Sequence, residues 1–403
     1  MRRIGLLGHN FIDWAGGLEF LRMMMASLQA VDEPLELHVL LPVRGPRVAL
    51  HGVLRRLRRA AARLLGRGVA SSYAPTTADV RQAFERVNGA VHLHRIDTGA
   101  AALRHAASRL GLEALIPAFH PLEPSAGRPW VGYIYDFQHR HLPHLFSDQE
   151  RASRDRQFDA MLARAAVIVV NARAVERDAR AFRPDSAARI VAMPINASPP
   201  PEWFDGDVPA TQARYGLAGP YLIICNQFWI HKDHRTAFDA FARIAAEFPD
   251  VRLVCTGATS DYRNPRHLEE LLAFARERGI GARVHVLGLI PKQDQVDLVR
   301  GARAVVQPTL SEGGPGGGAA YDAIALGVPA LVSDIPVNLE IEEPGVSFFR
   351  AGDPQALADA MRALLGALPQ PMRSPAALMA AGAERRRRCG LALLQAIALA
   401  EAR

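Results

Sequence analysis

A glycine-rich turn flanked by two carboxylates is the strongest chemical signal in the sequence. Five of the six residues from Gly313 to Gly318 are glycines, and Glu312 and Asp322 stand on either side. Glycine lets a backbone approach a ligand closely, and the helix expected after the turn offers unpaired N–H groups to a phosphate. Carboxylates accept hydrogen bonds from sugar or ribose hydroxyls. The pattern favours a ligand-binding turn over a plain tight turn, which uses the same residues.

A lysine occupies a comparable position earlier in the same half of the chain. Lys232 lies in the segment Cys225–His234, directly after an expected strand at Tyr221–Cys225. At the start of a helix, its ammonium would add a point positive charge to the end that faces a phosphate. A solvated surface lysine is the alternative, and the position after a strand disfavours it.

The elements that must position these residues alternate along nearly the whole chain. Short β-rich runs are separated by helical patterns, which is typical of parallel α/β sheets. Helix starts are marked by a capping box at Ser147 and Glu150 and by Asp353 followed by Pro354. Expected strands in the first half are Ile4–Gly8, Leu35–Leu41, Val91–His94, Ala114–Ile116, Trp130–Tyr135, Val167–Val170 and Ile190–Ala192. Those in the second half are Tyr221–Cys225, Val251–Cys255, Val284–Leu287, Ala304–Gln307, Ala330–Val332 and Ser347–Phe349.

A proline-rich linker divides the chain into two halves. Four prolines lie within residues 194–201, and proline removes backbone donors and excludes helix. We therefore expect two Rossmann-like α/β domains, residues 1–195 and 211–380, joined by a hinge at 196–210. A helix at 381–403 is expected to pack back on the first domain. Because ligands of open parallel sheets bind beyond the carboxyl ends of the strands, the cleft between the domains is the expected site.

Composition places the chain among globular proteins. Of its 403 residues, 49% are hydrophobic and 22% are charged, which excludes disordered and collagen-like chains. The longest apolar stretch, Leu391–Ala400, is shorter than the roughly 18 residues of a membrane span. The first residues reach polar side chains too early for a signal peptide. The three cysteines are too few for a disulfide framework or a four-cysteine zinc site. We expect a cytoplasmic protein.

The positive charge is concentrated in one segment. The net charge of +7 attracts anions without separating nucleic acid, membrane and phosphorylated metabolites. The arginine-rich run Arg44–Arg67 divides on a helix into a basic and an apolar face, which is typical of a helix on an anionic membrane. A solvated helix that packs its leucines on the domain is an equal alternative. The run lacks interleaved aromatic residues, which disfavours nucleic acid as a partner.

Several motifs of other enzyme classes are missing or misplaced. The first strand carries Gly5-Leu6-Leu7-Gly8 rather than G-x-G-x-x-G, which disfavours a dehydrogenase, and the chain contains no NTPase P-loop. Asp205-Gly206-Asp207 lies in the expected hinge and is interpreted as a turn. His92 and His94 alternate along a strand without a third ligand in the sequence nearby, so no metal site is predicted.

The order of these elements resembles glycosyltransferase family 4. The resemblance is carried by Lys232, Val251–Gly257, Val284–Gly288 and the stretch from Glu312 through Asp322 to Pro329. It covers the second half well and the first half more loosely. Members of this family are retaining sugar transferases with the GT-B fold, in which two Rossmann-like domains face each other across a cleft. The resemblance implies a nucleotide-sugar donor, a glycan or lipid-linked hydroxyl acceptor, no cofactor and no metal.

The resemblance also implies roles for individual residues. Lys232 would contact the donor diphosphate, Glu312 the donor sugar and Asp322 the ribose, and His139, which follows the strand at Trp130–Tyr135, would contact the sugar. The expected catalytic residues are His139, Glu312 and Lys232. The other expected donor-binding residues are Gly16, Gly17, Asn226, Gln227, Gly257, Leu289, Gly314, Gly316, Gly317, Gly318 and Asp322.

The sequence departs from the family pattern at two places. Gln227 stands where the family has an arginine, and Glu312 and Asp322 are two residues farther apart than the family's pair of glutamates. These departures allow an inactive nucleotide-sugar-binding protein as an alternative to a transferase acting in glycan, polysaccharide or glycolipid assembly. A nucleotide-sugar epimerase or phosphorylase of the same fold is a second alternative.

Overall fold

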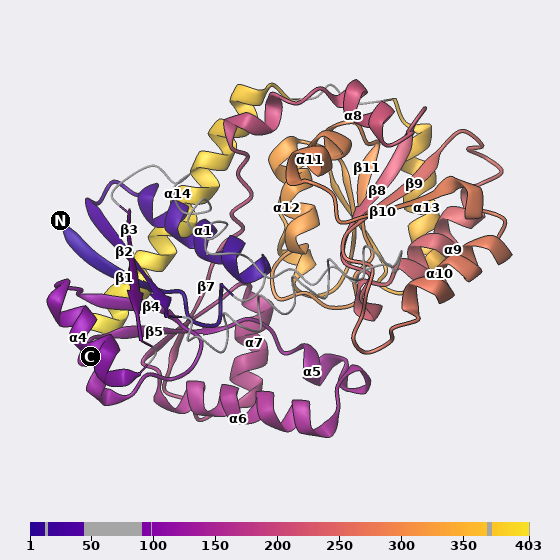
Figure 1. The fold of residues 1–403 in the computed structure, drawn as a ribbon. Coiled ribbons are helices and arrows are strands. Elements are labelled where there is room, and N and C mark those ends of the chain that lie inside the picture. The colour runs from indigo at the N-terminus through magenta and orange to yellow at the C-terminus, as the bar shows by residue number, and fades with distance from the viewer. Residues whose placement is uncertain (13–14, 44–90, 98, 369–372, 403) are drawn as a thin grey trace, which may run out of the picture.

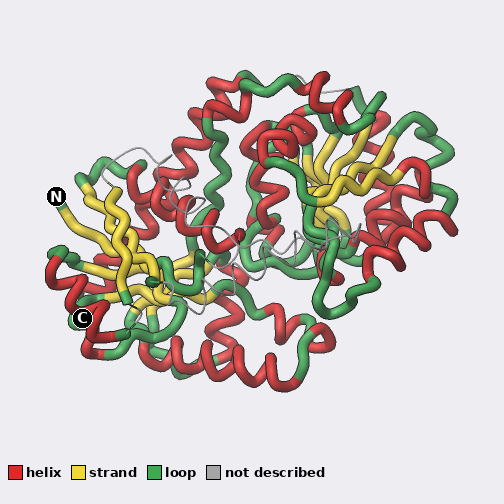
Figure 2. Tube along the Cα trace, in the orientation of Figure 1, coloured by secondary structure: helices red, strands yellow, loops and turns green. Residues whose placement is uncertain are grey.

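The computed structural model describes residues 1–12, 15–43, 91–97, 99–368 and 373–402. In these residues the chain forms two parallel β-sheets with helices packed on them, one sheet in each half of the sequence (Figures 1 and 2). This confirms the expected architecture of two Rossmann-like domains. The Arg44–Arg67 run, with its predicted amphipathic helix, lies outside the described residues.

The N-terminal sheet has seven parallel strands in the order β3-β2-β1-β4-β5-β6-β7. The direction of winding reverses between β1 and β4, and ligands of such sheets bind at this type of switch point. The strands are β1 (Arg2–Leu7), β2 (Leu35–Pro42), β3 (Val91–Ile96), β4 (Ala114–Ala118), β5 (Trp130–Ile134), β6 (Val167–Val170) and β7 (Arg189–Ala192).

The C-terminal sheet has six parallel strands in the order β10-β9-β8-β11-β12-β13. Its switch point lies between β8 and β11, so the segments that follow these two strands meet at one edge of the sheet. The strands are β8 (Tyr221–Cys225), β9 (Arg252–Thr256), β10 (Val284–Gly288), β11 (Ala304–Gln307), β12 (Ala330–Ser333) and β13 (Val346–Phe349).

Two predicted helix starts are confirmed. Ser147 and Glu150 form a reciprocal capping box, and the Asp353 side chain accepts hydrogen bonds from the N–H groups of Gln355 and Ala356. The helices of the N-terminal half are α1 (Ala15–Gln29), α4 (Ala100–Arg109), α5 (Gln138–His141), α6 (Asp148–Arg164) and α7 (Arg173–Phe182). Those of the C-terminal half are α8 (Val208–Arg214), α9 (His234–Ile244), α10 (His267–Glu277), α11 (Lys292–Arg300), α12 (Gly317–Leu326), α13 (Pro354–Gly366) and α14 (Pro375–Glu401).

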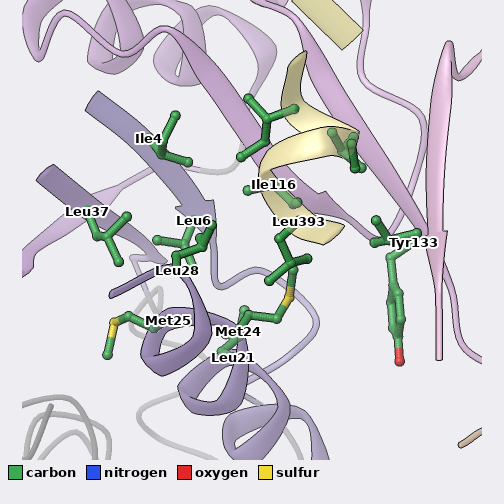
Figure 3. Packing of buried hydrophobic residues seen from close by; sticks show 14 of the residues in the cluster. Ile4, Leu6, Leu21, Met24, Met25, Leu28, Leu37, Ile116, Tyr133 and Leu393 are labelled. Atoms are coloured by element: carbon green, nitrogen blue, oxygen red, sulfur yellow. The ribbon is translucent and has the colours of Figure 1, made fainter. Parts of the chain in front are cut away.

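The last helix, α14, joins the two domains. Figure 1 shows it in yellow beside α1, and Leu393 of α14 packs among Ile4, Leu6 and Met24 in the core of the N-terminal domain (Figure 3). Near its other end, the Arg385 guanidinium binds the Glu343 carboxylate at 2.5 and 2.6 Å and donates to the carbonyl of Ala197 at 3.1 Å. Helix α14 thus contacts both domains.

None of the helices in the described residues combines the length and the apolar character that crossing a membrane requires.

Candidate active site

The site is built on the switch point of the C-terminal sheet. Asn226 directly follows β8, Gln307 ends β11, and both side chains are buried. The Asn226 amide donates to Gln307 Oε1 at 2.5 Å, and the Gln307 amide in turn donates to Glu312 Oε1 at 3.0 Å. The two central strands are therefore joined by side chains at the edge where a ligand of such a sheet binds, and the chain of bonds ends on the predicted carboxylate.

Lys232 and Glu312 form an ion pair with side chains that are only 13% and 11% exposed. The Glu312 carboxylate lies against the start of α12, where a Cβ added to Gly317 would stand 3.0 Å from it. A helix N-terminus attracts anions, so the carboxylate occupies the kind of position that a phosphate favours. A diphosphate bound here would share both Lys232 and the helix end with Glu312.

The glycine-rich turn adopts a backbone that side chains would prevent. Gly316 and Gly317 have φ angles of 72° and 58°, in the left-handed region that favours glycine. A Cβ on Gly313 would collide with the carbonyl oxygen of Tyr135, which belongs to the N-terminal domain. Gly318 is exposed, with open space where a side chain would stand. The turn is thus pressed against the opposite domain at one end and open at the other.

The second predicted carboxylate, Asp322, is buried and also paired. Its Oδ2 accepts from the Lys292 ammonium at 2.5 Å and from the Gln295 amide at 3.2 Å. Lys292 is half exposed, at the start of α11, and its ammonium lies 4.9 Å from the ring centre of Trp203 in the linker. The charge of Glu19 in α1 also acts on Lys292. The start of α1, which contains Gly16 and Gly17, therefore lies on this side of the site.

Lys232 and Lys292 are the only lysines in the sequence; the other 46 basic residues counted with them are arginines. Each of the two is paired with one of the carboxylates that flank the glycine-rich turn. A lysine ammonium is a compact point charge that can turn from one anion to another more freely than the planar guanidinium of arginine. Each ammonium could therefore interact with its carboxylate and with an anionic ligand at the same time.

On the side of the N-terminal domain, His139 is almost completely buried in α5. Its Nε2 is 2.8 Å from Asp155 Oδ1, and the ring lies among Phe137, Phe146 and Phe158. Burial lowers the pKa of His139, and the hydrogen bond with Asp155 opposes that shift. The imidazole is neutral near pH 7, and its Nδ1 has no hydrogen-bond partner among the described residues.

Asp136 is a site residue that the sequence analysis missed. It follows β5, and Arg154 Nη1 lies 3.5 Å from its carboxylate. Burial raises the pKa of Asp136, Arg154 opposes that shift, and the negative charge of Glu312 from the other domain adds to it. Asp136 and Glu312 are thus close enough for their charges to interact across the boundary between the domains.

The remaining predicted residues are arranged around this centre. Gln227 follows Asn226 and has a buried Oε1 without a partner in the described structure. Gly257 has a φ of 133°, and a Cβ there would collide with the Asn226 carbonyl, so this glycine lets the loop after β8 pass close by. Leu289 is 50% exposed just beyond β10, and Gly314 lies against Asn171 of the N-terminal domain.

The residues that the sequence analysis missed left signals of different strength. Lys292 starts a helix just after a strand, the same pattern that singled out Lys232. Asp136 lies in the same run as His139. Gln307 and Asn338 left no signal, because their role depends on partners that only the folded chain brings to them.

A separate open pocket lies beyond the carboxyl ends of β1 to β4 in the N-terminal domain. Its lining includes Leu103, Phe119, His9 and His120, and its cavity volume is about 90 Å³. In the described part of the chain, no group of three or more His, Cys, Asp or Glu side chains is arranged to hold a metal ion.

Comparison with known proteins gives a family match in the second half of the chain. Residues 215–373 match the family model for glycosyl transferases group 1, and this range contains both lysines and both carboxylates of the turn. A search of curated proteins gave no match.

Solved structures match the whole chain. Sucrose-phosphate synthase from Thermosynechococcus elongatus has a TM-score of 0.61 at 17% identity, covering 99% of this chain and 97% of that one. Anabaena HepE in complex with UDP-glucose has a TM-score of 0.59 at 15% identity, covering 99% and 98%. An E. coli structure described as trehalose-6-phosphate bound with UDP-2-fluoro glucose has a TM-score of 0.62 at 11% identity, covering 98% of each chain. These likenesses concern the fold of two facing domains.

Proposed function

We propose that this chain, which matches the group 1 glycosyl transferase model over residues 215–373 and has the GT-B fold overall, transfers a sugar from a nucleotide-sugar donor to a hydroxyl acceptor with retention of configuration. The family match over residues 215–373 and the fold are consistent with the expected resemblance to glycosyltransferase family 4. The observation that carries the finer proposal is the convergence of Lys232, Glu312 and the start of α12 at the switch point of the C-terminal sheet.

The chemical demand of this reaction is stabilisation of the departing diphosphate. The bond between the anomeric carbon and the phosphate oxygen breaks, and its electron pair leaves with the phosphate. Lys232 and the N–H groups at the start of α12 are fixed in place before the reaction, which is how preorganised electrostatics lower a barrier. The acceptor oxygen bonds to the anomeric carbon on the face that the phosphate leaves, and the departing phosphate oxygen takes the hydroxyl proton.

The other residues sort by the part of the donor that they suit. Asp322, positioned by Lys292 and Gln295, suits the ribose hydroxyls, and exposed Leu289 suits the face of a base. We assign Glu312, Asp136 and His139 to the sugar, because the charges of Glu312 and His139 both act on Asp136 at the boundary between the domains. The pocket beyond β1 to β4 suits the acceptor, since it opens at the carboxyl ends of the N-terminal strands. Whether that acceptor is a glycan or is lipid-linked stays a prediction, as does contact with an anionic membrane.

The first experiment is a thermal-shift screen against UDP-, GDP-, ADP- and dTDP-sugars, because a ligand that binds only the folded state raises the melting temperature. UDP-sugars come first, since HepE is described in complex with UDP and with UDP-glucose. The donor that binds is then incubated with hydroxyl acceptors, and the anomeric configuration of the product is read by NMR.

Each outcome of this assay separates the alternatives. Transfer with retention, unchanged by EDTA, supports the proposal. Conversion of the donor without an acceptor indicates an epimerase, and binding without turnover across the acceptor panel indicates a binding protein. Loss of transfer on chelation would contradict the assignment of charge stabilisation to protein groups.

A further inference from the structure

The segment after β12 contacts both the glycine-rich turn and the N-terminal domain. We call residues Ile335–Ile341 the bridging segment. Val337, only 7% exposed, packs in the N-terminal hydrophobic cluster that contains Phe158 and Val175, and Ile335 packs against the same cluster. A segment of the C-terminal domain therefore forms part of the packing of the other domain.

Glu340 of the bridging segment caps a helix of the N-terminal domain. α7 begins after Ala172, which has no side chain able to accept a hydrogen bond from the helix. The Glu340 carboxylate accepts hydrogen bonds from the N–H groups of Ala174 at 2.6 Å and Arg173 at 2.9 Å. A carboxylate at this position satisfies unpaired donors and interacts favourably with the helix dipole. The cap of α7 therefore depends on the position of the other domain.

Asn338, two residues earlier, holds the glycine-rich turn. Its side chain is fully buried, and its Oδ1 accepts from the Gly316 N–H at 2.7 Å. Its Nδ2 donates to the Ser333 carbonyl at 2.9 Å, and the Ser333 hydroxyl donates to the Thr309 carbonyl at 2.6 Å. Asn338 is thus oriented from one side by the end of β12 and fixes, on the other side, the residue that precedes α12.

We propose that the bridging segment couples the position of the N-terminal domain to the geometry of the glycine-rich turn, with Glu340 and Asn338 as positioning residues. Asn338 to Glu340 form a single short 3₁₀ turn, so a displacement of α7 that carries Glu340 with it also moves the side chain that holds Gly316. When α7 and Glu340 have the positions described above, Asn338 holds Gly316, and the glycine-rich turn presents its N–H groups to a ligand with the geometry seen here. The coupling itself does not depend on the proposed function; only the choice of ligand below rests on it.

The first test needs no ligand and measures amide hydrogen exchange by NMR. Glu340→Ala removes the cap, and Glu340→Gln keeps one acceptor oxygen without the charge. We expect Glu340→Ala to speed exchange at Arg173 and Ala174 about tenfold, as expected for loss of charge-assisted bonds, and at Gly316 several-fold, with Glu340→Gln in between. The control is Glu342→Gln, which removes the same charge from an exposed residue without a bond in the described structure. Faster exchange at α7 with no change at Gly316 would overturn the proposal, because Glu340 would then be a local cap only.

The second test runs the coupling in the opposite direction with UDP as the probe. Coupling between two sites is reciprocal, so UDP bound at the turn should slow exchange at Arg173 and Ala174. Asn338→Ala should weaken UDP binding and, at a UDP concentration that calorimetry shows to saturate the variant, should no longer transmit this response, whereas Glu342→Gln should retain it. A response that persists in Asn338→Ala, or that is missing in the unsubstituted protein with UDP bound, would overturn the coupling. Failure of UDP to bind at all would instead count against the proposed donor, and the ligand-free test then decides the coupling.

Discussion

The two domains contribute to the site by different means. In the C-terminal domain, Lys232 and Lys292 are each paired with a carboxylate of the same domain. In the N-terminal domain, His139 is held among aromatic rings, and Asp136 interacts with Glu312 only across the domain boundary. The C-terminal domain holds the paired charges proposed to meet an anion, and the N-terminal domain adds residues that act across the boundary and, through the bridging segment, is proposed to set the geometry of the turn.

This difference predicts that substitutions in the two domains affect different steps, nucleotide binding in one case and turnover in the other. Changes on the C-terminal side should alter affinity for a bare nucleoside diphosphate. Changes on the N-terminal side should spare that affinity and alter turnover, since the residues there are proposed to act on the sugar and on the geometry of transfer. A C-terminal substitution that changes turnover alone, or an N-terminal substitution that lowers affinity for the nucleoside diphosphate, would contradict this prediction.

The largest effect is expected for Lys232→Ala. In the proposed function the ammonium would bind the diphosphate of the donor, and more strongly as charge develops on departure, so affinity for UDP and turnover should both fall. A charge-assisted contact is worth about 1.5–3 kcal/mol, or roughly ten- to hundredfold in affinity. Calorimetry with UDP and the transfer assay measure the two effects. Arg235→Ala, an exposed cation on the same segment of chain, is the control and should change neither. An unchanged Lys232→Ala would mean that the phosphate site lies elsewhere.

The next effect concerns His139, on the other side of the comparison. His139→Gln can keep a bond to Asp155, removes the imidazole and should lower kcat about tenfold, while affinity for UDP changes less than twofold. The control His141→Gln alters a more exposed histidine of the same short helix. Loss of UDP affinity in His139→Gln, with the melting temperature unchanged, would place His139 on the nucleotide side and contradict the prediction that N-terminal substitutions spare nucleotide affinity.

The sequence predicted the parts of this structure that depend on local pattern. Alternating apolar runs predicted the strands of both sheets, the glycine-rich turn singled out Glu312 and Asp322, and a position just after an expected strand singled out Lys232. Pairings between distant residues could not be predicted in this way. Glu340 caps a helix 166 residues earlier in the sequence, and Asn338 holds a glycine 22 residues away, and neither leaves a periodicity or a motif.

A smaller effect is expected for Asp322→Asn, which keeps the size of the side chain and removes its charge. The ribose hydroxyls would lose an ionised acceptor, and Lys292 would lose its partner at 2.5 Å. Affinity for UDP should fall about fivefold, on the order of 1 kcal/mol, with little change in kcat at saturating donor. The control Lys292→Arg keeps a cation beside Asp322 and should lower the affinity for UDP less than Asp322→Asn does.

A labelling experiment tests both assignments together. Because Lys232 and Lys292 are the only lysines in the sequence, reductive ¹³C-methylation gives two side-chain signals, and UDP should shift both. Shifts at one lysine alone would separate the phosphate and ribose assignments.

The smallest effect contrasts two histidines and their influence on stability. In the C-terminal domain, the His234 ring stacks on Phe228 with centroids 4.2 Å apart, and neither ring nitrogen has a partner among the described residues. Burial, with the nearby charges of His267 and Lys232, lowers the pKa of His234 to about 3. Below pH 6.5 the imidazole of His234 takes up a proton in the unfolded chain but not in the folded chain. Acidification therefore lowers the free energy of unfolding, by about 0.7 kcal/mol between pH 7 and pH 6.

His141 of the N-terminal domain has the opposite sign. Its hydrogen bond with Asp178, 2.7 Å long, raises the pKa of His141, so its contribution is present below pH 6.5 and is lost as pH rises through the folded value. Melting temperatures from pH 5.5 to 7.5 test both signs. His234→Phe should flatten the loss of stability on acidification, because the group that resists protonation is gone, and His141→Gln should steepen it. Parallel pH profiles for His234→Phe and the unsubstituted protein would mean that the His234 ring takes up its proton in the folded state, which its burial against Phe228 argues against.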